Sequence, residues 1–233
     1  AGDDSLHHKK KWFSKSRKYD LGIIYFGNND KIAHLYKKES DIYVRLKGPK
    51  WTMIREVLIK WKGWKKYNYV AFPDDDLDIS VTKLNNLFKI GNDYKLNLFQ
   101  PALIDNGIKY VRHDILKVHK DCKLRYTDFV EIMIPIFSQK ALNKSYKILT
   151  DINIKSGWGV DYIIPSKILH RKHIAVIDSI PITHTKPLGA LNIAKKSSFY
   201  KEFNIDPEAE MRYFLKKWNA RPYQQRTLKC INL

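Results

Sequence analysis

Short apolar runs alternate along the first part of the chain with segments whose apolar positions recur at helical spacing. Three runs, 20–26, 41–46 and 68–72, predict buried strands, and turn-forming glycine, asparagine or proline residues follow them. The segments 50–61 and 81–90 place apolar residues on one face of a helix. Strands that alternate with helices are typical of βα units, so the pattern predicts a mostly parallel sheet.

Beyond residue 99 the pattern is mixed. It predicts further strands at 109–112, 128–135 and 174–178, and helices at 138–150 and 159–169. No repeat or low-complexity linker separates these elements. The sequence therefore predicts one α/β domain.

The two ends of the chain differ in composition from this domain. Residues 1–19 are polar and lack the apolar stretch of a signal peptide, so we interpret them as a polar leader. We place the domain at 20–190 and interpret 191–233 as its C-terminal helical extension. In that extension Asp206, followed by proline, predicts a helix start, because a carboxylate caps the first turn and proline suits the first helical position. The helix is expected to run to about Trp218, with a polar tail after it.

Composition adds a strong charge signal. Hydrophobic residues make up 44% of the chain, enough for a packed core, and the net charge is +19. Such a charge attracts nucleic acid, anionic lipid surfaces or phosphorylated substrates, but solubility explains it equally well. No apolar run reaches the ~18 residues that a membrane-spanning helix requires.

The two cysteines, Cys122 and Cys230, lie far apart and outside any CxxC motif. This arrangement predicts free thiols. Free thiols favour a reducing, cytoplasmic setting for a protein that is soluble or peripherally associated with a membrane.

Acidic residues cluster directly after the third predicted strand, at Asp74, Asp75, Asp76 and Asp78. Two carboxylates ~4 Å apart repel by ~1 kcal/mol even in water, and a divalent cation offsets this repulsion well. Oxygen ligands favour Mg²⁺ or Mn²⁺ over zinc, and open α/β sheets bind ligands beyond the carboxyl ends of their strands. The alternative is a solvated acidic turn.

Two further motifs follow the aspartates. The run SGWGVD at 156–161 presents Asp161 at a predicted helix start, where the helix dipole alone would also favour a carboxylate. The run ITHT at 182–185 places His184 at the end of an apolar segment, where a histidine is more often structural than a metal ligand.

The three motifs in this order resemble the GT-A fold glycosyltransferases. The runs FVEIM at 129–133 and PIFS at 135–138, together with GWGVD at 157–161, resemble one group more closely. This group is a family of uncharacterised glycosyltransferase-like proteins of plants and bacteria, with relatives in large DNA viruses. The resemblance covers roughly residues 20–189. It implies a Rossmann-like, mostly parallel central sheet flanked by helices, with a C-terminal helix.

The resemblance also implies a metal site. Asp74, Asp75 and Asp76 are similar to the DXD motif, in which Asp76 binds the metal directly. Asp74 or Asp75 reaches the ribose or a metal-bound water. His184 is similar in place to the C-terminal metal ligand of that fold. We therefore expect Asp74, Asp76 and His184 to hold Mn²⁺ or Mg²⁺.

The donor-binding residues are inferred in the same way. Tyr25 and Gly27, at the end of the first strand, are expected to face the nucleotide base or ribose. Lys50 and Arg55, on the helix before the metal strand, are expected to reach the diphosphate. Arg112 is a candidate contact of the donor sugar or the acceptor.

The catalytic base has two candidates. Asp161 resembles the carboxylate that activates the acceptor in inverting members of the fold. Many relatives carry two acidic residues there, whereas Val160 precedes Asp161 in this chain, and Glu131 is therefore the rival.

These observations predict a metal-dependent glycosyltransferase, expected to be a hexosyltransferase. It would move a sugar from a nucleotide-diphosphate donor, with UDP-sugars such as UDP-glucose favoured, to a glycan or other hydroxyl acceptor with inversion. Nucleic acid is not an obligate partner, and peripheral contact with an anionic membrane surface is expected.

Two alternatives stay open. Clustered aspartates also suit a metal-dependent nuclease or phosphotransferase. Aromatic residues interleaved with lysines over 60–69 suit a basic nucleic-acid-binding module.

Overall fold

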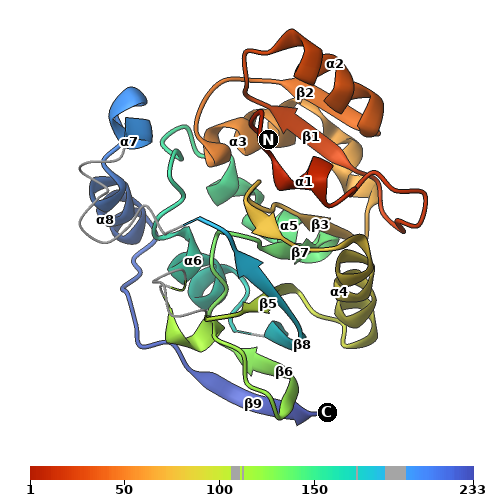
Figure 1. Cartoon of the computed structure of the whole chain (residues 1–233). Helices are drawn as coiled ribbons and strands as arrows, with labels where there is room; N and C mark the ends of the chain where they lie inside the picture. The colour runs from red at the N-terminus through yellow and green to blue at the C-terminus, as the bar shows by residue number, and fades with distance from the viewer. Residues whose placement is uncertain (106–110, 112, 172, 187–197) are drawn as a thin grey trace.

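The computed structural model describes residues 1–105, 111, 113–171, 173–186 and 198–233. It confirms the α/β class, with a central sheet flanked by helices (Figure 1). The strands are β1 (Gly22–Tyr25), β2 (Ile42–Arg45), β3 (Tyr69–Ala71), β4 (Leu77–Asp78), β5 (Leu98–Leu103), β6 (Cys122–Thr127), β7 (Ile136–Ser138), β8 (Ile174–His184) and β9 (Thr227–Asn232). The helices are α1 (Leu6–Lys9), α2 (Asp30–Glu39), α3 (Lys50–Lys60), α4 (Val81–Asp93), α5 (Gln139–Leu149), α6 (Val160–Ile163), α7 (Ser198–Glu202) and α8 (Pro207–Lys217). Shorter turns are η1 (Lys62–Lys66), η2 (Asp114–Leu116) and the π-helical η3 (Ile164–Ile168).

The expectation of a mostly parallel sheet is corrected. In the larger sheet, whose order is β3-β7-β5-β8-β6-β9, only the β5–β8 pair is parallel among the described strands. The strands β1 and β2 form a separate parallel pair. Periodicity indicates that a segment is a strand, but it says nothing about the direction of the partner, which depends on distant segments.

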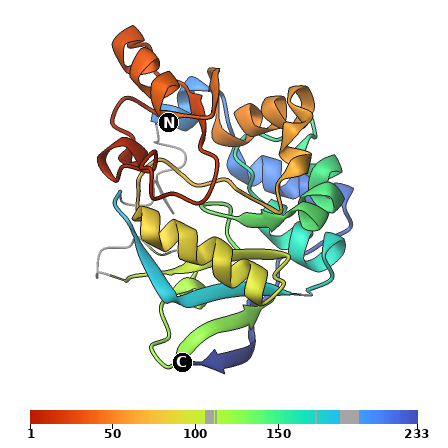
Figure 2. The same cartoon turned by 90° about the vertical axis from the view of Figure 1, so that its right-hand side faces the viewer.

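The larger sheet separates two apolar cores. One core packs α4 against the sheet and includes Leu84, Leu87, Phe99 and Ile177. The other gathers α3, α5, α6 and α8 through residues such as Trp51, Leu142, Ile163 and Phe214. Figure 2 shows α4, in yellow, beside β8, in cyan. Among the described residues, no helix has both the length and the apolar character needed to cross a membrane.

The strand expected at 128–135 is wrong. Residues 128–135 form an irregular segment that is almost entirely buried, and the strand β7 begins only at Ile136. A continuous apolar run looks the same whether it is a strand or a buried loop. The strand expected at 109–112 lies outside the described residues, apart from Val111.

The C-terminal tail contributes to the sheet instead of remaining a polar tail. Helix α8 begins after Asp206, whose carboxylate accepts a hydrogen bond from the Ala209 amide as predicted, but the chain then returns as β9 beside β6. A disulfide joins Cys122 on β6 to Cys230 on β9, with 5.7 Å between their Cα atoms. The expectation of free thiols is therefore wrong, and the two cysteines do not indicate a cytoplasmic setting.

The N-terminal segment packs against the domain. Trp12 is buried and its indole nitrogen donates to the Ile79 carbonyl at 2.7 Å. The Leu6 amide donates to the Asp75 carbonyl at 2.8 Å. Because backbone groups make many of these contacts, the polar composition of the segment did not reveal them.

Candidate metal and donor site

The topology brings the acidic loop and His184 to one edge of the sheet. Strand β7 is antiparallel to both β3 and β5, and β5 is parallel to β8, so β3 and β8 run in the same direction. Their carboxyl ends therefore meet, which is where α/β sheets bind ligands. The loop after β3 carries Asp74 and Asp76, and His184 is the last residue of β8.

The short strand β4 completes this arrangement. Leu77 pairs with His184 across the β4–β8 ladder, which places Asp76 beside the imidazole. His184 Nε2 lies 3.3 Å from Asp76 Oδ1. One ligand atom from each of Asp74, Asp76 and His184 lies within 4.8 Å of the others. The three predicted metal ligands therefore come together, although His184 is distant from the aspartates in sequence.

The protonation states of this cluster are coupled. Burial raises the pKa of Asp74, and the charge of Lys50 opposes it only in part. Burial would also raise the pKa of Asp76, but the hydrogen bond and charge of His184 outweigh burial and the pKa is lowered. Burial lowers the pKa of His184, yet its contact with Asp76 leaves the pKa raised overall. Since only a neutral imidazole binds a metal, a cation at this cluster would compete with the proton of His184.

Lys50, a predicted contact of the donor diphosphate, lies at the cluster. It is the first residue of α3, and its ammonium donates to Asp74 Oδ1 at 2.6 Å. The same ammonium donates to the carbonyl oxygens of Ile132 and Met133, at 2.8 and 2.9 Å. Since an ammonium has three protons, these contacts use all of its donors. Lys50 thus links the acidic loop to the buried segment that carries Glu131.

Asp75 faces away from the cluster. Its Oδ2 accepts the Gly2 amide at 2.7 Å, and its carbonyl accepts the Leu6 amide. The N-terminal segment therefore holds Asp75, while Asp74 and Asp76 point toward His184.

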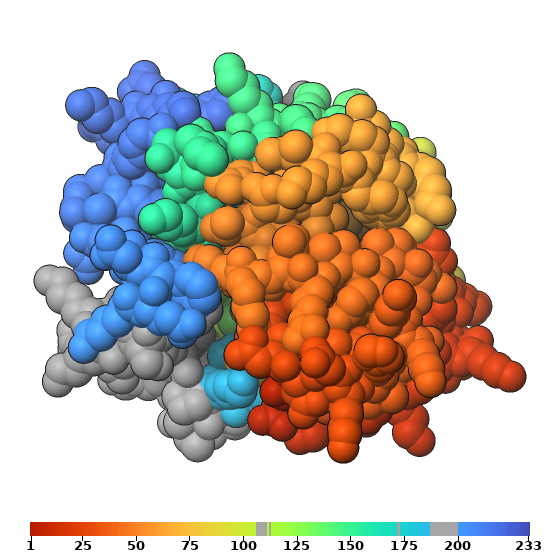
Figure 3. Space-filling view, turned by 90° about the horizontal axis from the view of Figure 1, so that it is seen from above, coloured from red at the N-terminus to blue at the C-terminus, as the bar shows by residue number. Residues whose placement is uncertain are grey.

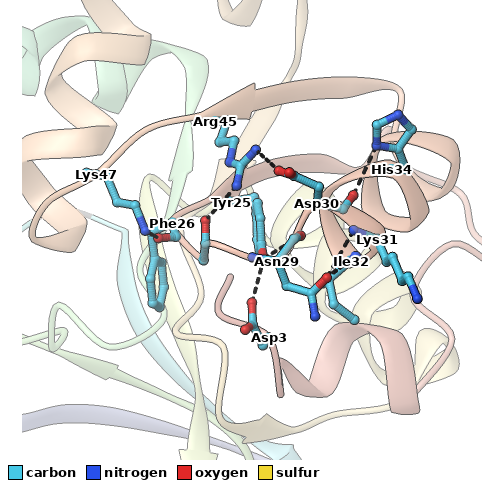
Figure 4. Close-up of polar contacts among 11 residues, drawn as sticks. Asp3, Tyr25, Phe26, Asn29, Asp30, Lys31, Ile32, His34, Arg45 and Lys47 are labelled. Atoms are coloured by element: carbon cyan, nitrogen blue, oxygen red, sulfur yellow. Dashed lines mark hydrogen bonds and ion pairs between the residues drawn. The ribbon is translucent and has the colours of Figure 1, made fainter.

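Two of the predicted donor contacts point elsewhere. Tyr25 is fully buried, and its hydroxyl donates to Asp3 Oδ1 at 2.5 Å and accepts the Asn29 amide at 3.0 Å (Figure 4). Burial raises the pKa of Tyr25, and the hydrogen bond to Asp3 adds to this. Gly27 lies against the same pair, because a Cβ there would meet Asp3 and Tyr25 at 2.1 and 2.3 Å. These residues brace the start of α2.

The two predicted arginines give different outcomes. Arg55 lies on the same helix as Lys50, but its guanidinium donates to the Ile152 carbonyl at 2.7 Å and to Glu56 at 2.8 Å. It therefore binds the loop after α5. Arg112 lies outside the described residues.

A hollow of about 180 Å³ opens next to the cluster. Lys50, Asp74 and Asp75 are among its lining residues, together with apolar side chains such as Phe26 and Phe72. Seen from above, the cyan surface of the segment around the end of β8 borders the N-terminal part in red and orange (Figure 3). The site therefore combines charged groups with apolar walls.

The two candidate bases share a second, much smaller cavity. Glu131 and Asp161 both line a space of about 10 Å³, which has room for about one water. Glu131 is buried, and its amide donates to the side chain of Gln100 at 2.6 Å. Its negative charge also contributes to the raised pKa of His184, so Glu131 is within electrostatic reach of the cluster. Gln100 on β5 carried no signal in the sequence beyond being a polar residue in an apolar run.

The backbone conformation explains why the GWGVD motif contains two glycines. Gly157 and Gly159 adopt φ angles of +81° and +90°, a region that disfavours other residues. A Cβ at Gly157 would also meet the Trp51 ring at 2.5 Å. The motif therefore forms a tight turn that leads directly into α6 and Asp161.

Fold and cluster together define an α/β protein of the GT-A type, with an acidic loop and a histidine at the carboxyl edge of its sheet. A solved structure of S. aureus TarS (residues 1–349) aligns with a TM-score of 0.55 at 15% identity, covering 84% of this chain and 65% of that one. A second, in complex with UDP-GlcNAc, aligns with a TM-score of 0.55 at 13% identity, covering 93% of this chain and 63% of that one. This likeness shows the fold, and the chain spans less than two-thirds of the length of these TarS structures.

The sequence profile of the DUF707 family, described as proteins of unknown function, matches residues 10–230, and the chain belongs to this family. The resemblance found in the sequence is thereby confirmed. A comparison with curated protein sequences found no significant match.

Proposed function

We propose that this chain is a glycosyltransferase that uses a nucleoside-diphosphate sugar and a divalent metal held by Asp74, Asp76 and His184. The observation that carries the proposal is the convergence of three ligand atoms within 4.8 Å at the shared edge of β3 and β8. Two carboxylates and one imidazole fit Mn²⁺ better than Mg²⁺, because imidazole is a poor ligand for the harder ion. Among the described residues this is the one such group of three, which argues against a two-metal nuclease site.

The hollow beside the cluster supports a nucleotide donor. Its apolar lining residues, such as Phe26 and Phe72, suit a nucleobase, and the positive charge of Lys50 suits a diphosphate. We favour a UDP-sugar, and a hexose such as glucose or N-acetylglucosamine, because a protein of the same fold binds UDP-GlcNAc. The acceptor is proposed to be a hydroxyl group, such as that of a glycan.

The residues have separate tasks in this proposal. When bound, the metal supplies Lewis-acid stabilisation for the diphosphate that leaves. Lys50 adds positive charge on the same side of the donor. A carboxylate, Asp161 or Glu131, accepts the proton of the acceptor hydroxyl, and a single displacement inverts the anomeric carbon.

Binding and turnover of donors test the proposal. UDP and UDP-sugars should raise the melting temperature with Mn²⁺ present but not with a chelator, because a ligand of the native state stabilises it. Asp76→Asn should abolish this Mn²⁺-dependent shift and the slow hydrolysis of UDP-sugars. Asp78→Asn is the matched control, since Asp78 is bound to Lys10 and lies outside the group of ligands. Unchanged donor hydrolysis by Asp76→Asn would overturn the metal assignment.

A further inference from the structure

A buried carboxylate on α8 holds the turn that precedes Asp161. Glu210 Oε1 accepts the backbone amides of Lys155 and Gly157, at 3.1 and 2.8 Å. Its Oε2 accepts both the amide and the hydroxyl of Ser156, at 2.8 and 2.9 Å. Glu210 is only 9% exposed. Hydrogen bonds to an ionised acceptor are about twice as strong as neutral ones, so four of them hold the turn firmly.

The same turn is enclosed on two sides. Gly157 lies against the Trp51 ring on α3, and Gly159 lies against Met211, which follows Glu210 on α8. The Ser156 hydroxyl in turn accepts the Trp158 amide at 3.2 Å. The turn is therefore held between α3 and α8.

Asp161 depends on this turn for its place. Gly159 is the N-cap of α6, and Asp161 lies in the first turn of that four-residue helix. A helix this short has little stability of its own, because forming its first turn is unfavourable. Its orientation must come from the segment before it and from its packing; α6 and α8 are in contact.

We infer that Glu210 is a positioning residue of the transfer reaction, which orients Asp161 toward the acceptor through the turn at 155–157. The inference rests on the proposed function, and on Asp161 as the one of its two candidate bases that acts on the acceptor hydroxyl. Both carboxylate oxygens of Glu210 accept hydrogen bonds from the turn, and Glu210 is not one of the candidate metal ligands. Its effect should therefore fall on the rate of transfer and not on donor or metal binding.

The test replaces the carboxylate by an amide. Glu210→Gln has nearly the same shape, but its NH₂ group faces backbone N–H donors and cannot accept from them. We expect kcat to fall about tenfold or more, as a misplacement near 1 Å can cause. The donor KM and the Mn²⁺ affinity should stay within about twofold of the wild-type values. A variant that loses only the geometry of the reacting groups lowers kcat without weakening substrate binding. Hydrogen exchange of the amides at 155–157 should become faster.

Matched variants on the same helix separate positioning from folding. Glu208→Gln changes an exposed glutamate paired with Arg212 and should alter none of these quantities. Asp206→Ala removes the cap of α8 and should lower the melting temperature. At temperatures where this variant is folded, its kcat should equal that of the wild type. Ser156→Ala removes a single bond to Glu210 and should give a smaller effect of the same kind as Glu210→Gln.

Three results would overturn the inference. The first is that Asp206→Ala, when it is destabilised as much as Glu210→Gln, also turns over more slowly than the wild type. Another is a raised donor KM with unchanged kcat in Glu210→Gln. The third is unchanged exchange at 155–157. If the wild-type protein turns over no donor, the proposed function fails, and the exchange measurement still decides whether Glu210 holds the turn.

Discussion

Lys50 shows how the acidic loop can exist in a folded chain before any cation binds. Its ammonium contacts Asp74 and two partly buried carbonyl oxygens, so its removal would leave all three acceptors without this donor. We expect Lys50→Met to lose about 1–3 kcal/mol of unfolding free energy, the cost of leaving buried polar groups unpaired. Urea denaturation measures this. Lys60→Met, which removes an exposed lysine paired with Glu56, should change it by less than about 1 kcal/mol.

The same substitution should weaken donor binding. If Lys50 contacts the diphosphate, Lys50→Met raises the KM for a UDP-sugar, whereas Lys60→Met leaves it unchanged. A lower stability with an unchanged donor KM would show that Lys50 serves the fold alone.

The choice between Asp161 and Glu131 is also made at the residue scale. We expect Asp161→Asn to cut transfer by ~10²-fold or more with little change in UDP and metal affinity, because positioned proton transfer contributes about that much. Glu131→Gln should alter Mn²⁺ affinity instead, since its charge acts on His184. Measurements of steady-state transfer and of Mn²⁺ affinity in both variants decide between the two carboxylates. If Glu131→Gln alone stops transfer while Asp161→Asn is fully active, the base is Glu131.

Among the elements, the N-terminal segment departs most from its expected role. Trp12 is 5% exposed and its indole nitrogen is hydrogen-bonded to Ile79. We expect Trp12→Ala to lower the unfolding free energy by about 3–5 kcal/mol, as large-to-small changes in a core do. Lys11→Ala, at an exposed neighbour, is the control. Equal stability of the two variants in urea would show that this segment is a leader outside the fold, as its composition suggested.

Strand β4 has an effect larger than its two residues suggest. Its pairing with β8 places Asp76 beside His184, and Thr185 adds bonds to the Asp76 carbonyl at 3.1 Å from its amide and 2.7 Å from its hydroxyl. Backbone pairing thus brings the candidate metal ligands together. A strand of two residues is too short for any local sequence pattern to predict it.

At the scale of the whole molecule, the disulfide ties the last strand to the sheet. It joins residues 108 positions apart, and the loop it closes contains the GWGVD turn, His184 and Glu210. A cross-link over a loop of about 100 residues stabilises by about 4–5 kcal/mol in the chain-entropy model. We expect reduction, or the double variant Cys122→Ser/Cys230→Ser, to lower the unfolding free energy by up to that amount. Denaturation curves with and without reductant measure it, and coincident curves would contradict the prediction.

The sequence predicted the parts of this protein that depend on neighbouring residues. The apolar runs indicated β1, β2, β3 and the first part of β8, and helical spacing indicated α3, α4 and α5. Asp206 marked the start of α8 because capping is a local interaction. The resemblance named Asp74, Asp76, His184 and Lys50, and these four residues do come together.

Tertiary structure decided everything that depends on distant partners. Whether strands pair parallel or antiparallel, whether Asp75 faces a cluster or an N-terminal amide, and whether two cysteines meet are matters of long-range contact. The run at 128–135 is buried as its apolar character required, yet it is a loop, because Lys50 and Gln100 take up some of its backbone hydrogen bonds. Apolar pattern reports burial, whereas the pairing of backbone groups depends on which other segments reach the same place.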